Sequence, residues 1–250
     1  SCACELRLLG YEVDIYEAKD QPSGLALYGC APYKVTNEDI LEEVNYLQAL
    51  FQFTIHYDHP VETKKQLSDL ESQYTAIFLG VGLGNTRTLG IEKEDLENCE
   101  GATEFIERVK IDPLSVDVKK RVIVIGGGNT AMDAASESAR LGAEEVTIAY
   151  RRSKEEMGAY AFEYELAVSV GVKGMFNVSP VAILGKDKVS GVQFIRTRVE
   201  NGKVLPIPGT EFEKECDMVI RATGQSKKEA LSAMINGLET ETNGTIKVDS

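Results

Sequence analysis

Three consecutive glycines and a small residue beyond them follow an unbroken apolar stretch midway along the chain, where residues 121–133 read RVIVIGGGNTAMD. A strand, a G-x-G-x-x-A turn and a helix form the setting of a dinucleotide-binding loop. Gly126 would allow the tight turn, Gly128 would let the backbone approach a pyrophosphate, and Ala131 would let helix and strand pack closely. The helix N-terminus would hold the phosphates through free N–H groups and its positive dipole end. The pattern predicts a dinucleotide site; the alternative is a tight turn that binds nothing.

Two arginines, Arg151 and Arg152, follow the next expected strand, residues 145–150. At this position of a dinucleotide-binding unit an acid binds the ribose 2′-hydroxyl, whereas arginine accommodates a 2′-phosphate. The pair therefore favours NADP(H), with NAD(H) as the alternative. A solvated basic turn is the other interpretation of these residues.

The same helix end, glycine and strand occur twice, in residues 9–17 and in residues 141–150. The first copy ends in Glu17, an acid placed to accept from the ribose of an unphosphorylated nucleotide such as FAD. Ala131 lies eleven residues before Gly142, and the matching residue of the first copy would precede Ser1. We therefore expect the first unit to be incomplete, without its first strand and glycine loop. A natural start at Ser1 is the alternative.

Around these motifs the periodicity predicts an α/β protein with two Rossmann-like dinucleotide-binding units. Residues 1–118 should form a partial FAD-binding domain with a linking helix, residues 119–224 an NAD(P)H-binding domain, and residues 225–250 the start of a return to the first domain. A parallel sheet should lie at the centre of the second domain, with a small antiparallel sheet over about residues 179–216. Expected helices cover about 1–9, 36–50, 102–110, 130–141 and 162–170. Expected strands cover 12–17, 53–56, 75–81, 121–125, 145–150 and 217–222, and a loop rich in Gly, Pro and Tyr is expected over residues 21–34.

The composition of the chain argues against several classes of binding partner and bound group. The formal net charge of −13 argues against nucleic acid and anionic membranes, since it leaves no basic surplus for phosphates. No apolar run approaches the roughly 20 residues of a membrane span. Five scattered cysteines with no Cys-x-x-Cys pair argue against a redox dithiol and against an iron–sulfur cluster held wholly by this chain. They favour a reducing compartment, the cytoplasm. His56 and His59 lack a third metal ligand nearby, and Glu163 and Glu165 are expected on a helix surface.

Several motifs together resemble one family. Residues 23–34 read SGLALYGCAPYK and residues 78–84 read FLGVGLG, and both precede the glycine loop, Tyr150-Arg-Arg and Glu156-Met157 in the family's order. The chain resembles the glutamate synthase small-subunit family, most of all the branch with the FAD/NAD(P)H module of dihydropyrimidine dehydrogenase and its bacterial flavin subunit. Ser23, Cys30 and Gly158 depart from the family's usual glycine, aliphatic residue and proline. The family's late Gly-Gly-Asp motif is absent. The resemblance implies a glutathione-reductase-like two-nucleotide flavoprotein.

The resemblance also implies roles for individual residues. Glu17 would bind the FAD ribose, and FAD would be lined by Gly24, Leu25 and Lys34 and approached by turns at Gly80 and Gly82. The nicotinamide nucleotide would be held by Gly126, Gly127, Gly128, Asn129, Thr130, Ala131, Arg151, Arg152, Ala222, Thr223 and Gly224. No catalytic residue is expected, because hydride transfer from nicotinamide to flavin needs no side-chain acid or base. Lys34 is a hypothetical stabiliser of charge on the reduced flavin.

The activity implied by the resemblance is electron input. NAD(P)H would reduce FAD, and FAD would pass electrons to iron–sulfur clusters in a domain or partner outside this sequence, and from there to a substrate-reducing subunit. Pyrimidine reduction is the first expectation. A glutamate synthase small subunit and a ferredoxin–NADP(H) transhydrogenase subunit are alternatives of the same class. A nucleotide-binding fragment without turnover is the alternative of a different class.

Overall fold

The computed structural model describes residues 1–248. The chain divides into two compact units, which we call unit 1 and unit 2. Unit 1 contains Ser1–Leu27, Tyr33–Gly84 and the chain from Ser226 on, and unit 2 contains Tyr28–Pro32 and Asn85–Gln225. These units are defined by packing alone. The expected division at residues 118 and 224 concerns which nucleotide each part binds, and it stays a prediction.

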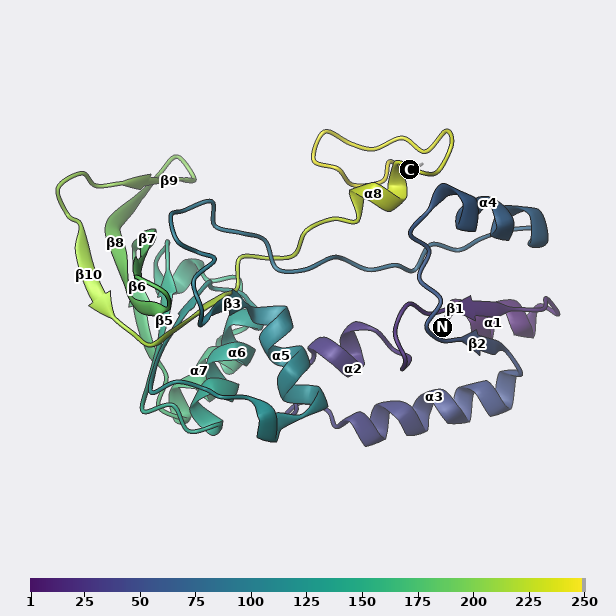
Figure 1. Cartoon of the computed structure of the whole chain (residues 1–250), viewed down its shortest axis with the longest axis horizontal. Helices are drawn as coiled ribbons and strands as arrows, with labels where there is room; N and C mark the ends of the chain where they lie inside the picture. Colours follow the sequence, from purple (N-terminus) through teal and green to yellow (C-terminus); the bar gives the residue numbers. More distant parts are fainter. Residues whose placement is uncertain (249–250) are drawn as a thin grey trace. The chain divides into compact units, whose positions relative to one another are not determined.

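The centre of unit 2 is a five-stranded parallel sheet in the order β3-β11-β4-β5-β6. Figure 1 labels three of its strands, β3, β5 and β6. The two strands expected around the glycine loop are confirmed at the bounds predicted for them. They are strands because their near-continuous apolar runs suit a sheet that is buried on both faces. The strands are β3 (Cys99–Gly101), β4 (Arg121–Ile125), β5 (Glu145–Tyr150), β6 (Lys173–Phe176) and β11 (Met218–Arg221).

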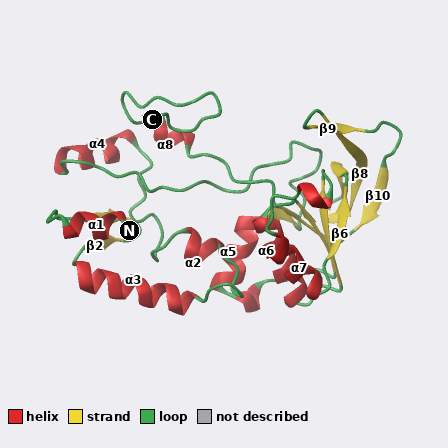
Figure 2. Cartoon of the chain, turned by 180° about the vertical axis from the view of Figure 1, so that it is seen from behind, coloured by secondary structure: helices red, strands yellow, loops and turns green. Residues whose placement is uncertain are grey.

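Three helices cover one face of this sheet (Figure 2). Val122 and Val124 of β4 point into the core beneath these helices, while Ile123 and Ile125 point into a second core on the opposite face. The helices are α5 (Ala102–Ile111), α6 (Asn129–Arg140) and α7 (Ala161–Ser169), with short 3-10 turns at Pro113–Ser115 and Lys154–Glu156. This alternation explains why every residue of β4 after Arg121 is buried.

The second face packs against an antiparallel sheet, which confirms the expected region of short strands. Phe194 and Val192 of its long central strand are fully buried there. The strands are β7 (Val178–Gly185), β8 (Val189–Glu200), β9 (Lys203–Pro206) and β10 (Phe212–Glu215). Unit 2 is thus a three-layer arrangement of helices, parallel sheet and antiparallel sheet.

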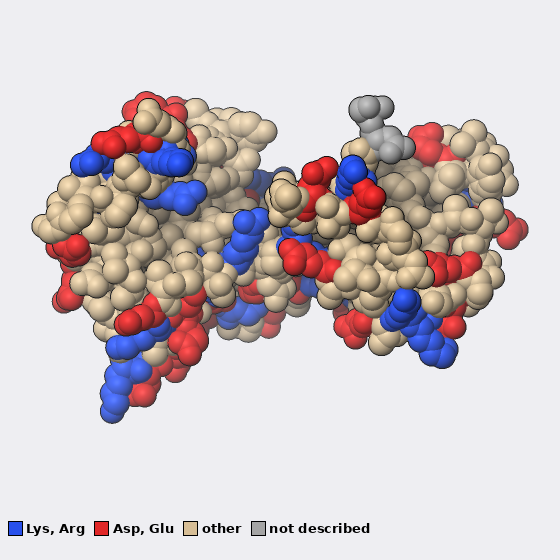
Figure 3. Space-filling view, turned by 90° about the horizontal axis from the view of Figure 1, so that it is seen from above, with Lys and Arg blue, Asp and Glu red and all other residues tan. Residues whose placement is uncertain are grey.

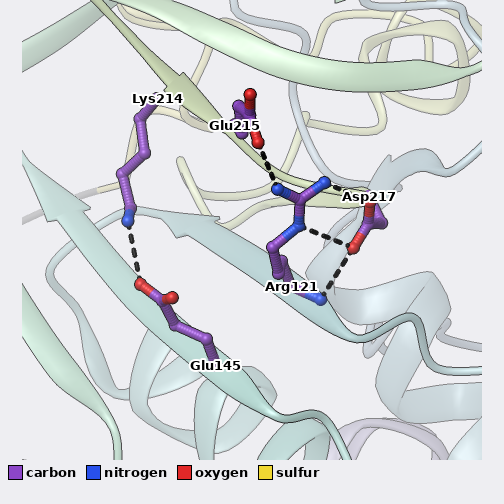
Figure 4. Close-up of polar contacts among 5 residues, drawn as sticks. All are labelled: Arg121, Glu145, Lys214, Glu215 and Asp217. Atoms are coloured by element: carbon purple, nitrogen blue, oxygen red, sulfur yellow. Dashed lines mark hydrogen bonds and ion pairs between the residues drawn. The ribbon is translucent and has the colours of Figure 1, made fainter.

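At the amino-terminal ends of the parallel strands, charged side chains bind the segment that leads from the antiparallel sheet back to β11 (Figure 4). Arg121 Nε and Nη2 donate to the two carboxylate oxygens of Asp217 at 3.0 and 2.8 Å, and Nη1 donates to Glu215 at 2.5 Å. Lys214 Nζ donates to Glu145 at 2.9 Å. These contacts join the start of β4 to the end of β10 and to Asp217 just before β11, and they join the start of β5 to β10.

Unit 1 contains mostly helices around a small parallel sheet of two strands. The side chain of Thr36 accepts from the Asp39 backbone N–H at 3.2 Å, which confirms the helix start expected there. A Thr63–Gln66 capping box starts the following helix. The elements are α1 (Cys2–Leu8), β1 (Asp14–Tyr16), α3 (Asn37–Phe51), β2 (Thr54–His56), α4 (Lys64–Gln73) and α8 (Glu229–Ser232), with α2 (Leu25–Gly29) spanning the boundary at Leu27.

Two sequence expectations in this region are wrong. Residues 75–81 do not form a buried strand: they have no regular secondary structure, they pair with no strand among the described residues, and Phe78 is 72% exposed. The cause is structural, since the only sheet of unit 1 within residues 1–248 contains β1 and β2 and gives this segment no neighbour. The loop expected over residues 21–34 also contains α2, a helix too short to show a periodic pattern.

Three further features of the described chain are its surface charges, the apolar character of its helices and its possible metal ligands. On the face drawn in Figure 3, acidic and basic side chains are interspersed. Within residues 1–248, no helix has both the length and the apolar character needed to cross a membrane. The same residues hold no group of three or more His, Cys, Asp or Glu side chains arranged for a metal ion.

Candidate nucleotide site

The glycine loop lies at the carboxyl edge of the parallel sheet, between β4 and β11. After β4 the chain builds β5 and β6 on one side, and it returns through the antiparallel sheet to place β11 on the other side. Ile125 at the end of β4 is paired with Ala149 of β5 and with Arg221 of β11. In open α/β sheets, ligands bind at such a reversal of strand order, outside the carboxyl ends of the strands.

Gly126 and Gly127 have no room for a side chain. A Cβ on Gly126 would lie 2.4 Å from the backbone oxygen of Ala222, and a Cβ on Gly127 would lie 2.4 Å from the ring of Tyr150. Ala222 is held in this place because its N–H donates to the carbonyl of Ile125 at 2.8 Å. The turn off β4 therefore depends on close approach to β11 on one side and to the end of β5 on the other.

Gly128 is different, because a Cβ there would meet nothing within 4 Å. It is the N-cap of α6, and it supplies no side-chain cap. The first N–H groups of a helix have few partners within the helix, and here the Ala131 N–H donates to the Gly128 carbonyl at 2.9 Å. The N–H groups of Asn129 and Thr130 are therefore the ones available to an anion. Ala131 is fully buried, as helix-to-strand packing requires. Thr130 is exposed, while Asn129 Oδ1 accepts from the Tyr160 N–H at 3.0 Å.

The two arginines after β5 have different surroundings. Arg151 is exposed, and within residues 1–248 its guanidinium has no recorded hydrogen bond or ion pair. The Arg152 side chain is 28% exposed and donates to Glu156 Oε1 at 3.0 Å and to the Gly202 carbonyl at 2.9 Å. The structure thus places both at the expected strand end but leaves only Arg151 open to a ligand.

The turn after β11 completes the edge. Thr223 Oγ1 donates to the Arg87 carbonyl at 3.2 Å, and the Gly224 carbonyl accepts from the Arg87 N–H at 2.9 Å. Together with the contact between Gly126 and Ala222, these bonds bring the 222–224 turn beside the glycine loop. The residues nominated for the nicotinamide nucleotide are therefore gathered along one sheet edge.

The residues nominated for FAD lie in unit 1, without a comparable phosphate loop in the described chain. Glu17 follows β1, its N–H donates to the His56 carbonyl at 2.9 Å, and its carboxylate accepts from the Lys19 N–H at 3.0 Å. Burial first, and then the nearby Glu17 charge, raise the pKa of Tyr57. The other nominated residues sit on loops or at a helix start: Gly24, Leu25, exposed Lys34, Gly80 and Gly82.

Sequence reasoning missed a polar cluster beside Glu17. Asp14 accepts from Tyr74 at 3.0 Å and lies 2.8 Å from His56 Nε2, and the Tyr16 and His56 rings stack with centroids 4.8 Å apart. The hydrogen bond with Tyr16 has the largest effect, and together with burial and Asp14 it raises the pKa of Tyr74. Alternation along β1 could have paired Asp14 with Tyr16, but the partners from β2 and α4 come from 42 and 60 residues away.

Glu163 is a second miss. It was expected on a helix surface, yet it is buried in the first turn of α7, whereas Glu165 is exposed as expected. The expectation fails because the helix has apolar residues on almost every side, so its periodicity does not reveal which face is inside.

The described residues fit the two cofactors that the resemblance implies to different extents. The space at Gly128, the uncapped start of α6 and the uncommitted Arg151 fit a dinucleotide with a 2′-phosphate. The described residues of unit 1 offer an acid, loops and the five-residue helix α2 after Gly24, but no G-x-G-x-x-A turn between a strand and a helix, so their fit to FAD covers one end of that nucleotide only.

Comparison with known proteins gives a consistent result along the chain. The model for pyridine nucleotide-disulphide oxidoreductases matches residues 1–250. The chain is 35% identical to the NADP(+)-dependent formate dehydrogenase subunit beta of Moorella thermoacetica, covering 100% of this chain and 36% of the relative. It is 32% identical to the glutamate synthase (NADPH) small chain of Escherichia coli, covering 90% and 51%. The chain therefore spans about a third to a half of these relatives, and its resemblance to glutamate synthase small subunits is confirmed.

Solved structures share the fold. FprA of Mycobacterium tuberculosis in complex with NADPH superposes with a TM-score of 0.76 at 22% identity, over 96% of this chain and 70% of that one. Thioredoxin reductase of T. acidophilum gives 0.67 at 18% identity, over 99% and 80%. These similarities confirm the expected α/β, two-nucleotide flavoprotein fold class.

Proposed function

The chain belongs to the pyridine nucleotide-disulphide oxidoreductase family, and from this premise we propose that it is the nucleotide-binding part of an NADP(H)-dependent flavoprotein oxidoreductase. The observation that carries the proposal is the open phosphate position at Gly128 with Arg151 uncommitted at the end of β5. An arginine in place of an acid at this strand end suits the 2′-phosphate of NADP(H).

The chemistry would belong to the cofactors: NADPH, when bound, would supply a hydride and FAD would accept it. The chain's own residues bind and orient. Backbone N–H groups after Gly128 would hold the pyrophosphate, Arg151 the 2′-phosphate, and the 222–224 turn the nicotinamide half. Glu17 would hold the FAD ribose, with Gly24, Leu25, Lys34, Gly80 and Gly82 along the flavin nucleotide. No side chain is assigned a proton transfer, and the role of Lys34 toward reduced flavin stays a hypothesis that Lys34→Met would test.

The electrons would then leave for iron–sulfur clusters in another domain or a partner subunit. Support comes from the relatives, which are named as beta or small subunits of larger enzymes. The terminal acceptor separates the candidates: pyrimidine reduction, a glutamate synthase small subunit or a ferredoxin–NADP(H) transhydrogenase subunit. A cytoplasmic location is part of the proposal, supported by five cysteines that are all free thiols.

Anaerobic rapid mixing of the flavin-loaded protein with NADPH or NADH tests the function, with flavin absorbance as the signal. We expect NADPH to reduce the flavin with the lower KM. Arg151→Ala combined with Arg152→Ala should raise the KM for NADPH about tenfold or more, because a charge-assisted contact contributes roughly 1.5–3 kcal/mol. The KM for NADH should change much less. Equal effects on both nucleotides would contradict the assignment, and nucleotide binding without flavin reduction would favour the non-catalytic alternative.

A further inference from the structure

The loop of residues 150–160 is fastened to the glycine loop at both of its ends. At one end, the Tyr150 ring lies against Gly127, leaving no space for a Cβ there. At the other end, the Ala159 N–H donates to the Gly127 carbonyl at 3.0 Å and the Tyr160 N–H donates to Asn129 Oδ1 at 3.0 Å. The position of the arginines within this loop is therefore set relative to the phosphate site.

Glu156 is the centre of the loop's own hydrogen bonds. Its carboxylate accepts from Arg152 Nη1 at 3.0 Å and from the Ser153 N–H at 3.3 Å. Its carbonyl accepts from the Tyr150 hydroxyl at 3.0 Å. One residue thus connects the base of the loop, its turn and the second arginine.

Arg152 is held from a second direction. Its Nη2 donates to the carbonyl of Gly202, in the turn between β8 and β9, at 2.9 Å. Its own carbonyl accepts from the Asn177 N–H at 3.0 Å. To reach a phosphate, this guanidinium must give up a charge-assisted bond and a carbonyl bond. Arg151 is exposed and gives up only water, while its carbonyl is fixed by Thr197 Oγ1 at 2.9 Å.

We infer that Glu156 is a positioning residue that limits NADP(H) selectivity: it keeps Arg152 in the loop scaffold, so that Arg151 alone binds the 2′-phosphate. The inference rests on the proposed function. The inference gives different roles to Arg151 and Arg152, which the sequence alone does not distinguish. By the same inference, the Glu156 carboxylate weakens phosphate binding, because its negative charge repels the negative charge of the 2′-phosphate.

Calorimetric titration of the 250-residue chain with NADP+ and with NAD+ tests this without flavin. The readout is the ratio of the Kd for NAD+ to the Kd for NADP+, in which effects on loop order common to both nucleotides cancel. Arg151→Ala should lower the ratio about tenfold or more. Arg152→Ala should change it less than about threefold, and Glu156→Gln should raise it by about threefold or more, since a released Arg152 gains access to the phosphate.

Two controls sharpen the result. Glu155→Gln removes the same charge from an exposed neighbour and should leave the ratio unchanged. Adding Arg152→Ala to Glu156→Gln should abolish the gain. The inference is overturned if Arg152→Ala lowers the ratio as much as Arg151→Ala, or if Glu156→Gln leaves it unchanged or lowers it. Should Glu156→Gln fail to fold, the two arginine variants decide alone. A wild-type chain that binds neither nucleotide overturns the proposed function itself.

Discussion

Two stretches of similar sequence reach opposite structures in the two units. Residues 121–125 and residues 75–81 are both apolar, and both are followed by closely spaced glycines. The first becomes β4, buried between β5 and β11 with a core on each face. The second has no regular secondary structure and is mostly exposed, and within the described chain it has no strand beside it. Apolar character makes a parallel strand possible, but neighbours on both sides and cover on both faces make it real.

Hydrogen exchange gives the largest expected contrast between these regions. Backbone amides of residues 76–83 should exchange at least about a thousandfold faster than those of residues 122–125. Exposed segments open at almost no cost, whereas central strands open only with the whole unit, at several kcal/mol. Mass spectrometry of peptides covering both stretches measures this directly. Similar protection of the two stretches would mean that residues 76–83 are paired in solution.

Nucleotide affinity should follow the same contrast, at about a hundredfold. We expect the chain to bind NADP+ at least that much more tightly than FAD. Unit 2 offers N–H groups at the start of α6 and a free arginine, each contributing roughly 1.5–3 kcal/mol to anion binding. The described part of unit 1 offers only the five-residue α2 after Gly24, and it has Glu17 rather than an arginine after β1. Calorimetry with each nucleotide, using AMP as a control without a pyrophosphate, measures the difference. Tight stoichiometric FAD binding without NADP+ binding would reverse the comparison.

Two neighbouring glycines test why the unit 2 loop works. Gly126→Ala should lower the free energy of unfolding by about 1–3 kcal/mol, because its Cβ would meet the Ala222 carbonyl oxygen at 2.4 Å. Gly128→Ala should lower it by at most about 1 kcal/mol, because that site is open, yet weaken NADP+ binding about tenfold by occupying the phosphate approach. Urea titration and calorimetry on both variants separate the two effects. If Gly128→Ala binds NADP+ normally, the open space is not the phosphate position.

What the sequence predicted follows the same physical division. The bounds of β4 and β5 could be predicted because β-branched apolar runs end at a glycine or an arginine, and the start of α3 could be predicted from its Thr36 cap. β3 and β6 could not, since Glu100, Lys173 and Gly174 are poor strand residues that become strands only through pairing with β11 and β5.

The candidate site also contains some features that the sequence could predict and others that it could not. The glycine loop was predictable because its function depends on local spacing. The attachment of Arg152 to Gly202 was not, because it joins residues 50 apart through two sheets. Glu156 carries a sequence signal of its own: with Ser153, three residues before it, it forms a capping box.

The smallest expected effect is on stability, at the amino-terminal ends of the strands in the two sheets. There the contacts are between charged or polar side chains of the protein and involve no phosphate. In unit 2, Asp217 receives Arg121 in a two-pronged contact, and this hydrogen bonding holds the pKa of the Asp217 carboxyl below its usual value (Figure 4). In unit 1, Asp14 at the start of β1 is hydrogen-bonded to the uncharged hydroxyl of Tyr74 and to His56. Asp217→Asn should therefore lower the free energy of unfolding by about 1 kcal/mol or less at pH 7, since both partners are partly exposed.

Acidification should remove this contribution in a defined window. A carboxyl whose folded pKa is depressed stabilises the fold above its unfolded pKa, about 3.9, and the stabilisation is lost as pH falls through the folded value. The difference between wild type and Asp217→Asn should thus be constant from about pH 5 to 8 and shrink below about pH 4. Glu213→Gln, an exposed change of the same charge on β10, should show no such difference. Urea titrations across this range measure both variants. A difference that persists at pH 2 would show that the shape of the Asp217 side chain, rather than its charge, fastens β11 to β4.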